Sequence, residues 1–265
     1  MLECVVNVSE GRDSSILEDL ANRVRGNLLD LHSDPTHNRA VFTLAGAAVE
    51  VAARLLARRC VEVLDVSRHS GVHPRLGVVD VVPFVPLSTD TDLSCAIGAR
   101  DDFAKWFAGL GVPCFEYGVD LTLPEIRRRA WIDLLPAEGP SQPHPTAGAC
   151  CVGARSYLVA YNLWLTNGRL SEARAVARRI RCEDLRSLGL GIDGQAQVSM
   201  NLVAPLDLGP ATAYDLVAEQ ASIDHAELVG LIPAAVLAAV PRRRWAELGL
   251  SESSTIEARL AHLTR

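Results

Sequence analysis

Residues 2–24 read LECVVNVSEGRDSSILEDLANRV, a stretch that predicts a strand followed directly by a helix. Apolar side chains alternate between Leu2 and Val8, as they do in a strand with one buried face. Asp13 can cap a helix, and the apolar residues after it recur at helical spacing: Ile16, Leu17, Leu20 and Val24. Polar residues 9–12 form the turn between the strand and the helix.

The residues that follow predict further strands and helices. We expect strands at 28–32 and 39–45, a helix at 47–59 and a strand at 61–66. The order β-α-β-β-α-β is that of the split β-α-β, or ferredoxin-like, unit. The second half of the chain predicts the same order, with strands at 156–165, 185–191, 196–203 and 227–231 and helices at 170–181 and 210–221.

Further elements are expected between the halves and near the C-terminus: a strand at 78–85, a helix at 91–110, a strand at 113–117 and a helix at 255–260. We therefore predict an α+β fold of two ferredoxin-like subdomains, residues 1–138 and 139–265, packed with a ligand cleft between them. Segment 139–148 contains three prolines and two glycines. It is either a linker or a loop that covers a ligand, and its composition favours the linker.

The composition argues against several classes of protein. The net charge is −6 and aromatic residues are 5% of the chain, which does not favour a nucleic-acid partner. The longest apolar runs are too short to cross a membrane, and the N-terminus lacks the basic region of a secretory signal, so we expect a cytoplasmic protein. Seven scattered cysteines without C-x-x-C spacing indicate reduced thiols, with neither disulfides nor a cysteine zinc site.

Polar residues are concentrated in three short segments that flank apolar strands: 7–12, 32–39 and 67–80. Capping and turn formation explain much of the first two, but two histidines and an arginine exceed what the second turn needs. In the third, Gly71 and Pro74 oppose the helix that an H-x-x-x-H zinc site at His69 and His73 requires, so we expect no metal. A histidine beside a proline has limited backbone freedom, which suits a positioned general base.

Short stretches along nearly the entire chain carry a resemblance, and they occur in this order: 3–12, 38–39, 42–43, 67–80, 83–86, 139–141, 153–155, 160–162, 197–199, 201–202 and 227–233. Together they resemble the formiminotransferase family. The resemblance implies an enzyme of two split β-α-β subdomains, usually a homodimer, that moves a formimino group from N-formimino-L-glutamate to tetrahydrofolate. Tetrahydrofolate would be the co-substrate, and 5-formiminotetrahydrofolate and glutamate the products.

The same resemblance assigns site residues. It places the catalytic histidine at His73, not at His69, and the folate-contacting loop at 139–148, which overrides the linker interpretation. It further implies a substrate- and folate-binding set: Asn7, Asn38, Arg39, Asp80, Gly139, Pro140, Ser141, Gly148, Arg155, Asn162, Gln197 and Asn201. Asp80 would orient the imidazole, while Asn7, Asn38 and Arg39 would hold the amidine and a substrate carboxylate. We expect a bulky residue at Gly148 to weaken folate binding far more than it lowers thermal stability.

The chain also departs from the family's pattern. Animal enzymes of the family carry Asp where this chain has His32, Trp where it has Ala147 and Lys where it has Ser156, and region 181–195 is shortened. Loss of the lysines expected at position 156 and in region 181–195 would most affect capture of folate's glutamate tail. A one-carbon transferase with another donor or acceptor, and a non-catalytic binding module, therefore stay open as alternatives. Ammonia release from the product is expected to require a separate cyclodeaminase.

Overall fold

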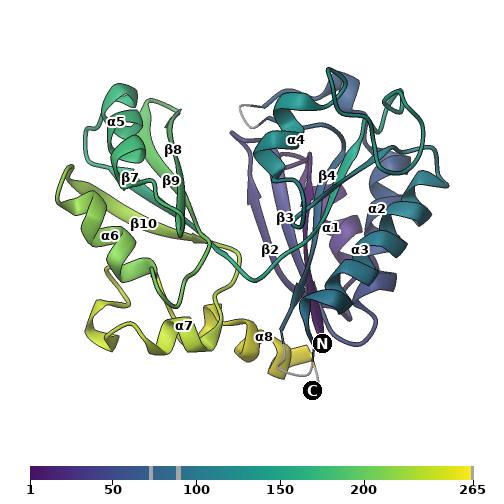
Figure 1. The fold of residues 1–265 in the computed structure, drawn as a ribbon. Helices are drawn as coiled ribbons and strands as arrows, with labels where there is room; N and C mark the ends of the chain where they lie inside the picture. Colours follow the sequence, from purple (N-terminus) through teal and green to yellow (C-terminus); the bar gives the residue numbers. More distant parts are fainter. Residues whose placement is uncertain (72–73, 88–90, 264–265) are drawn as a thin grey trace. The chain divides into compact units, whose positions relative to one another are not determined.

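The structure is a computed structural model that describes residues 1–71, 74–87 and 91–263. The chain forms two compact units, Met1–Ser156 and Tyr157–Arg265, and most of their elements are labelled in Figure 1. Each unit has its own sheet and apolar core, which confirms an α+β fold with two subdomains. The cleft expected between them stays a prediction. Within the described ranges, no helix is long and apolar enough to cross a membrane.

The described part of the first unit forms a six-stranded sheet in the order β2-β3-β1-β4-β6-β5: β1 (Leu2–Val8), β2 (Leu28–Asp34), β3 (Arg39–Ala45), β4 (Val79–Pro86), β5 (Cys114–Tyr117) and β6 (Cys150–Ala154). Strand β1 is antiparallel to both β3 and β4, which gives the first four strands the predicted split β-α-β arrangement. Strand β6 runs parallel to β4 and to β5. The units therefore divide after Ser156 and not at the predicted 138/139 boundary, because β6 completes the first sheet.

Helices cover both faces of this sheet. One face packs against α1 (Ser14–Arg23), α2 (Val49–Val63) and α3 (Leu93–Ala108) in a single apolar core. The short helix α4 (Leu123–Arg129) packs on the other face of β4, β5 and β6 through its fully buried Ile126. The predicted N-cap at Asp13 is confirmed, since its carboxylate accepts hydrogen bonds from the backbone of Ser15 and Ile16.

The strand predicted at 61–66 is wrong. Val61 and Val63 are β-branched and favour strands, but they lie in the last turn of α2, whose buried residues continue the helical period. A 3-10 turn, Val66–Arg68, follows. The position beside β1 that the predicted strand would fill is occupied by β4.

The second unit repeats the same order of elements: β7 (Val159–Leu165), α5 (Leu170–Ile180), β8 (Leu185–Ile192), β9 (Gln195–Leu202), α6 (Pro210–Ala218) and β10 (Ile223–Val229). Its strands lie in the order β10-β7-β9-β8, which confirms the predicted repeat. The turn between β8 and β9 is Asp193–Gly194, with positive φ values of 48° and 84°, as a tight type I′ hairpin requires. Helices α7 (Ala234–Ala238) and α8 (Ile256–Leu263) follow.

Candidate active site

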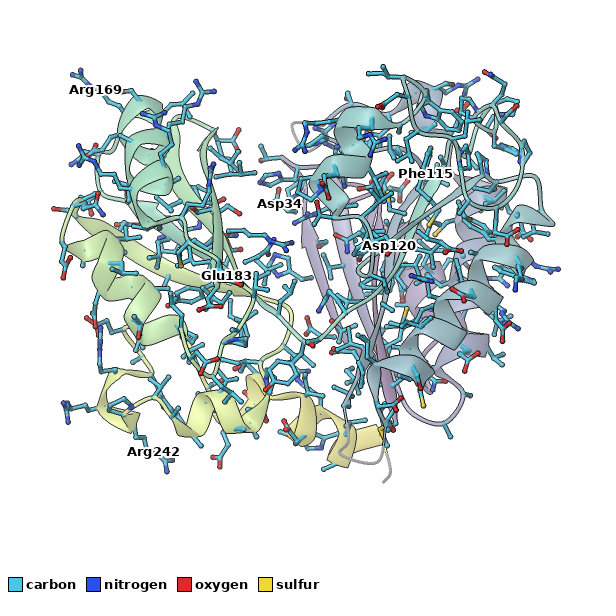
Figure 2. All side chains as sticks on the ribbon, in the orientation of Figure 1. Asp34, Phe115, Asp120, Arg169, Glu183 and Arg242 are labelled. Carbon is cyan, nitrogen blue, oxygen red and sulfur yellow. The ribbon has the colours of Figure 1, made fainter. Side chains whose placement is uncertain are left out.

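The three polar segments of the first unit converge at one edge of its sheet. Strands β1 and β2 end at this edge, while β3 and β4 begin there, because neighbouring strands among these four are antiparallel. Asp34, labelled in Figure 2, closes the β2–β3 hairpin by accepting hydrogen bonds from the backbone nitrogens of Thr36 and His37, both at 2.8 Å. The fold thus brings together side chains that are far apart in the sequence.

Asn38 joins all three segments with its own atoms. Its amide oxygen accepts from the Gly11 nitrogen at 2.9 Å, and its amide nitrogen donates to the Ser70 carbonyl at 3.0 Å. Its backbone carbonyl accepts from Nε2 of His69 at 2.9 Å. The residue is 7% exposed and has a φ of 47°, a conformation that asparagine adopts more readily than most residues. The amide oxygen of Asn38 is therefore engaged in organising the site.

His69 has both ring nitrogens in contacts. Nε2 lies 2.9 Å from the Asn38 carbonyl, and Nη1 of Arg75 contacts both Nδ1 and Nε2 of the ring. Burial and the Arg75 charge lower the pKa of His69, although its contact with the Asn38 carbonyl opposes this. An imidazole whose two ring nitrogens both contact protein groups is poorly suited to take a proton from a substrate. His69 is therefore a structural histidine, whereas His73 lies outside the described residues.

Asp80 and Arg127 hold the segment that follows His73 in the sequence. Asp80 is 2% exposed, and its Oδ1 accepts from the Leu76 nitrogen at 2.7 Å. Its Oδ2 accepts from Nη2 of Arg127 at 2.5 Å, while Nη1 of Arg127 donates to the Pro74 carbonyl. Sequence reasoning missed Arg127, which stands in a run of three arginines at the end of α4 and carries no local signal.

Positive charge is concentrated at this edge. Burial lowers the pKa of the Arg39 guanidinium, and the Asp80 and Asp34 carboxylates oppose that change. Burial likewise lowers the pKa of Arg75. Both side chains nevertheless stay protonated at neutral pH, because a guanidinium is a very weak acid. Partly desolvated guanidinium groups suit the recognition of a substrate carboxylate.

A pocket of about 270 Å³ opens beside these segments. Its lining includes Ser9, Glu10, Asn38 and His69. The Glu10 carboxylate accepts hydrogen bonds from the backbone of three successive residues, 11–13, so it caps the turn after β1. Pockets for drug-sized ligands usually measure about 300–1,000 Å³. This pocket can therefore take a part of a substrate but not a whole folate.

The predicted folate loop packs against the same edge of the sheet. The Val78 nitrogen donates to the Ala147 carbonyl at 2.9 Å, and the Ala149 nitrogen donates to the Leu76 carbonyl at 3.0 Å. Gly148 has a φ of 73°, and a Cβ there would lie 2.2 Å from the Leu76 oxygen. Gly148 is thus required by the backbone, which corrects the expectation that its replacement would spare stability.

The other predicted residues of the first unit are more scattered. Gly139, Pro140 and Ser141 are exposed, and Gly139 packs against the end of α3. Asn7 begins the first polar segment near the end of β1, and its amide nitrogen donates to the Val5 carbonyl at 3.2 Å. Arg155 follows β6 at the opposite edge of the sheet, so the fold does not bring it to the other predicted residues.

The predicted residues of the second unit share one face of its sheet. Alternate residues of β7 and β9 fill the core, so Asn162, Gln197 and Asn201 point to the other face. Glu227 on β10 accepts hydrogen bonds from the Asn162 amide at 3.0 Å and from Nε1 of Trp164 at 3.2 Å. Sequence reasoning missed Glu227 as a site residue, although it lies in one of the stretches that carry the resemblance.

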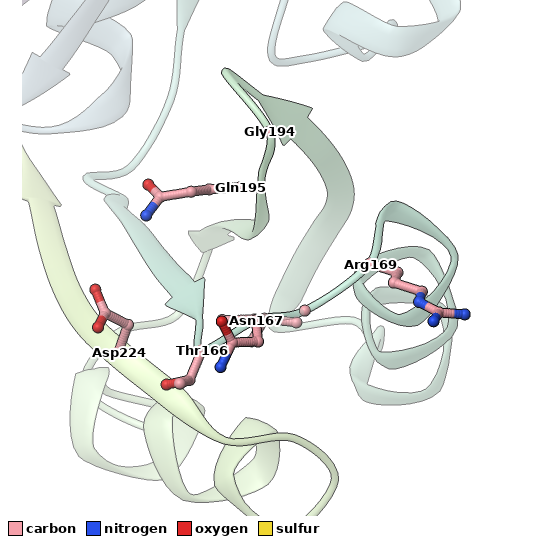
Figure 3. A pocket seen from close by; sticks show the side chains of 8 residues that line it. Thr166, Asn167, Arg169, Gly194, Gln195 and Asp224 are labelled. Carbon is pink, nitrogen blue, oxygen red and sulfur yellow. The ribbon is translucent and has the colours of Figure 1, made fainter.

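A second pocket, of about 470 Å³, lies in the second unit at the end of β7. Figure 3 shows Thr166, Asn167 and Asp224 near one another, with Gln195 across from them and Arg169 directed away along α5. Its lining contains none of the predicted site residues. Among the residues that the structure describes, no group of three or more His, Cys, Asp or Glu side chains is arranged to hold a metal ion.

Comparison with known proteins places these features in a family. The family model described as "Formiminotransferase domain, N-terminal subdomain" matches residues 1–155. The chain is also 32% identical to a glutamate formimidoyltransferase of Streptococcus pyogenes serotype M1 over 270 residues, 89% of this chain and 90% of that protein. This chain belongs to the formiminotransferase family.

Further members of the formiminotransferase family differ in length. A glutamate formimidoyltransferase of Thermoplasma acidophilum is 30% identical, and the match covers 98% of this chain and 97% of that protein. A formimidoyltransferase-cyclodeaminase of Sus scrofa is also 30% identical, but the match covers 88% of this chain and only 50% of that protein. The three polar segments of the first unit all lie within residues 1–155, which match the family model.

Proposed function

We propose that the chain transfers the formimino group of N-formimino-L-glutamate to N5 of tetrahydrofolate, giving 5-formiminotetrahydrofolate and glutamate. The observation that carries this proposal is the convergence of three polar segments around Asn38 within the residues that match the family. Relatives named glutamate formimidoyltransferase align with most of the chain, which supports the same activity here.

The reaction needs a group that accepts a proton and then gives it back. N5 attacks the formimino carbon to form a tetrahedral adduct, and the bond from this carbon to the glutamate nitrogen then breaks. A base removes the proton from N5 and returns it to the departing nitrogen, a role that a neutral imidazole fills near neutral pH. We assign this role to His73, since both ring nitrogens of His69 already contact protein groups.

We assign substrate binding to the groups around this base. Arg39, at the start of β3, supplies a charged guanidinium for a substrate carboxylate, and Asn7 supplies an amide for the formimino group. Segment 139–148, with Asn162, Gln197 and Asn201 of the second unit, is assigned to folate. The pocket of about 270 Å³ suits the small formimino donor better than a pteridine with its tail.

A turnover assay tests this function. The purified protein, given N-formimino-L-glutamate and tetrahydrofolate, should form 5-formiminotetrahydrofolate and glutamate in equal amounts. Fully oxidised folate is the matched control, because its N5 carries no hydrogen and should accept no formimino group. No transfer between the proposed pair would contradict the function.

The role of His73 is tested separately. His73→Gln should lower kcat by about 10²–10⁴-fold, the usual contribution of a general base, while the melting temperature stays near that of the wild type. The measurement is steady-state kinetics together with a thermal melt. A variant that keeps a near-normal rate would remove His73 from the mechanism.

We also propose a setting for this activity. The scattered cysteines without C-x-x-C spacing support a cytoplasmic location. The spacing of the histidines does not favour a metal site, so we propose that turnover continues after exhaustive chelation. Relatives named formimidoyltransferase-cyclodeaminase support the further proposal that a cyclodeaminase acts on the product. We retain the homodimer as part of the proposal, and sedimentation of the purified protein measures it.

A further inference from the structure

We propose that Arg127 is a positioning residue for the transfer reaction, and that it acts through Asp80 and Pro74 on the segment that carries Arg75. The proposal rests on the proposed function, because formimino transfer is the reaction that Arg127 would serve. It adds to that function a residue on α4, which is remote in sequence from all three polar segments.

The contacts of Arg127 form a clamp on both sides of Arg75. Nη2 of Arg127 lies 2.5 Å from Oδ2 of Asp80, and Nη1 donates to the Pro74 carbonyl. The second oxygen of Asp80 accepts from the Leu76 nitrogen at 2.7 Å. One guanidinium and one carboxylate thereby fix the backbone immediately before and immediately after Arg75.

The clamp is attached to a well-fixed part of the fold. Helix α4 begins with a capping box between Thr122 and Glu125, and Ile126, next to Arg127, is fully buried. The side chains of Arg127 and Asp80 are 16% and 3% exposed. A buried ion pair is costly to desolvate, so it is weak evidence for stability, and its contribution here is a defined geometry.

Arg75 connects the backbone that Arg127 and Asp80 fix to His37 and His69. Its Nη1 contacts the His69 ring, and its Nη2 donates to the His37 carbonyl at 3.1 Å. His69 in turn is held by the Asn38 carbonyl at 2.9 Å. A shift of residues 74–76 would therefore move Arg75 relative to His37 and His69 together.

Lysine cannot reproduce this clamp. The Arg127 fork presents two nitrogens to two separate acceptors, the Pro74 carbonyl and the Asp80 carboxylate, whereas an ammonium group is a single point charge. Arg127→Lys thus keeps the charge but loses one of the two attachments. Arg128→Lys is the matched control, because Arg128 is the next residue on α4 and is exposed.

Steady-state kinetics give the first test. Arg127→Lys should lower kcat by about 10- to 100-fold, because small misplacements of reacting groups have effects of this size. The KM for N-formimino-L-glutamate should stay within about threefold, since uniform binding is not removed. Arg128→Lys should match the wild type. A raised KM with unchanged kcat in Arg127→Lys, or an equal loss in Arg128→Lys, would overturn the proposal.

A readout without turnover separates this proposal from the proposed function. The ring ¹⁵N signals of His69, assigned with His69→Gln, can be followed against pH by NMR. The charged groups that face this ring are Arg75, Glu10 and Arg12. Displacement of Arg75 should raise the His69 pKa in Arg127→Lys but not in Arg128→Lys. If the wild type lacks transferase activity, the function fails, and this titration still decides whether the clamp exists.

A variant pair covers the case in which Arg127→Lys does not fold. Asp80→Asn with Arg127→Met removes both charges, which is tolerated far better than leaving one of them unpaired. If Arg127 acts through Asp80, Arg127→Met should lower kcat by less than about threefold in the Asp80→Asn background. Independent, multiplying losses from the two changes would overturn the proposal.

Discussion

The pKa of His69 depends on the burial of its ring and on the charged groups around it. Its ring contacts the Asn38 carbonyl and the Arg75 guanidinium, and burial together with Arg75 lowers its pKa. Protonation of the ring would oppose both burial and a neighbouring positive charge. His69 is therefore expected to remain neutral in the folded chain at pH values where a free histidine is already charged.

This pKa shift predicts a pH dependence of stability. An unfolded histidine titrates near pH 6.5, so the contribution of neutral His69 should be complete above about that value. As pH falls below it, the unfolded chain binds a proton that the folded chain does not, and the free energy of unfolding decreases. Urea unfolding at several pH values should show a smaller decrease in His69→Gln than in the wild type. Equal decreases would contradict the shift.

At the scale of elements, the packing around two glycines predicts that their replacement by alanine has opposite effects on stability. Gly148→Ala places a Cβ 2.2 Å from the Leu76 oxygen at a φ of 73°, so it should destabilise the fold by about 1–3 kcal/mol. Gly98→Ala is the control, because Gly98 lies in α3 with nothing within 4 Å of the added carbon. It should stabilise the fold by about 0.5–1 kcal/mol. Thermal melts of both variants give the measurement, and a neutral Gly148→Ala would contradict the close packing.

The elements also show how far sequence patterns reach. Clear periodicity predicted β1, α1 and the β-α-β-β-α-β order of elements in the second unit. The sequence pattern failed where strand pairing in the folded chain decides the structure. Strand β6 is short, CCVGA, and follows a proline-rich loop, so the sequence did not predict it. The domain boundary was therefore predicted at residue 138, before this strand. The density of polar residues found the segments that contain Asn38 and Asp80, and the resemblance assigned roles to these two residues. It could not find Arg127, because the contact with Asp80 spans 47 residues of sequence.

The whole molecule consists of two units with separate apolar cores, and the cysteines are divided unevenly between them. Cys4, Cys60, Cys114, Cys150 and Cys151 are buried, and all five lie in the first unit. Burial raises the pKa of each of these thiols, so almost none of their thiolate forms at neutral pH. Exposed cysteines are Cys95 of the first unit and Cys182 of the second.

This distribution makes thiol labelling a probe of one unit. In the native chain a thiol reagent should modify Cys95 and Cys182 rapidly, and the other five only when the first unit opens. Tryptophan offers the matched probe of the second unit, through Trp164 and Trp245, once Trp106 and Trp131 are replaced by phenylalanine. If the two cores unfold separately, labelling of the five buried thiols and the tryptophan signal should change at different urea concentrations. A single midpoint for both would show that the two cores unfold as one cooperative structure.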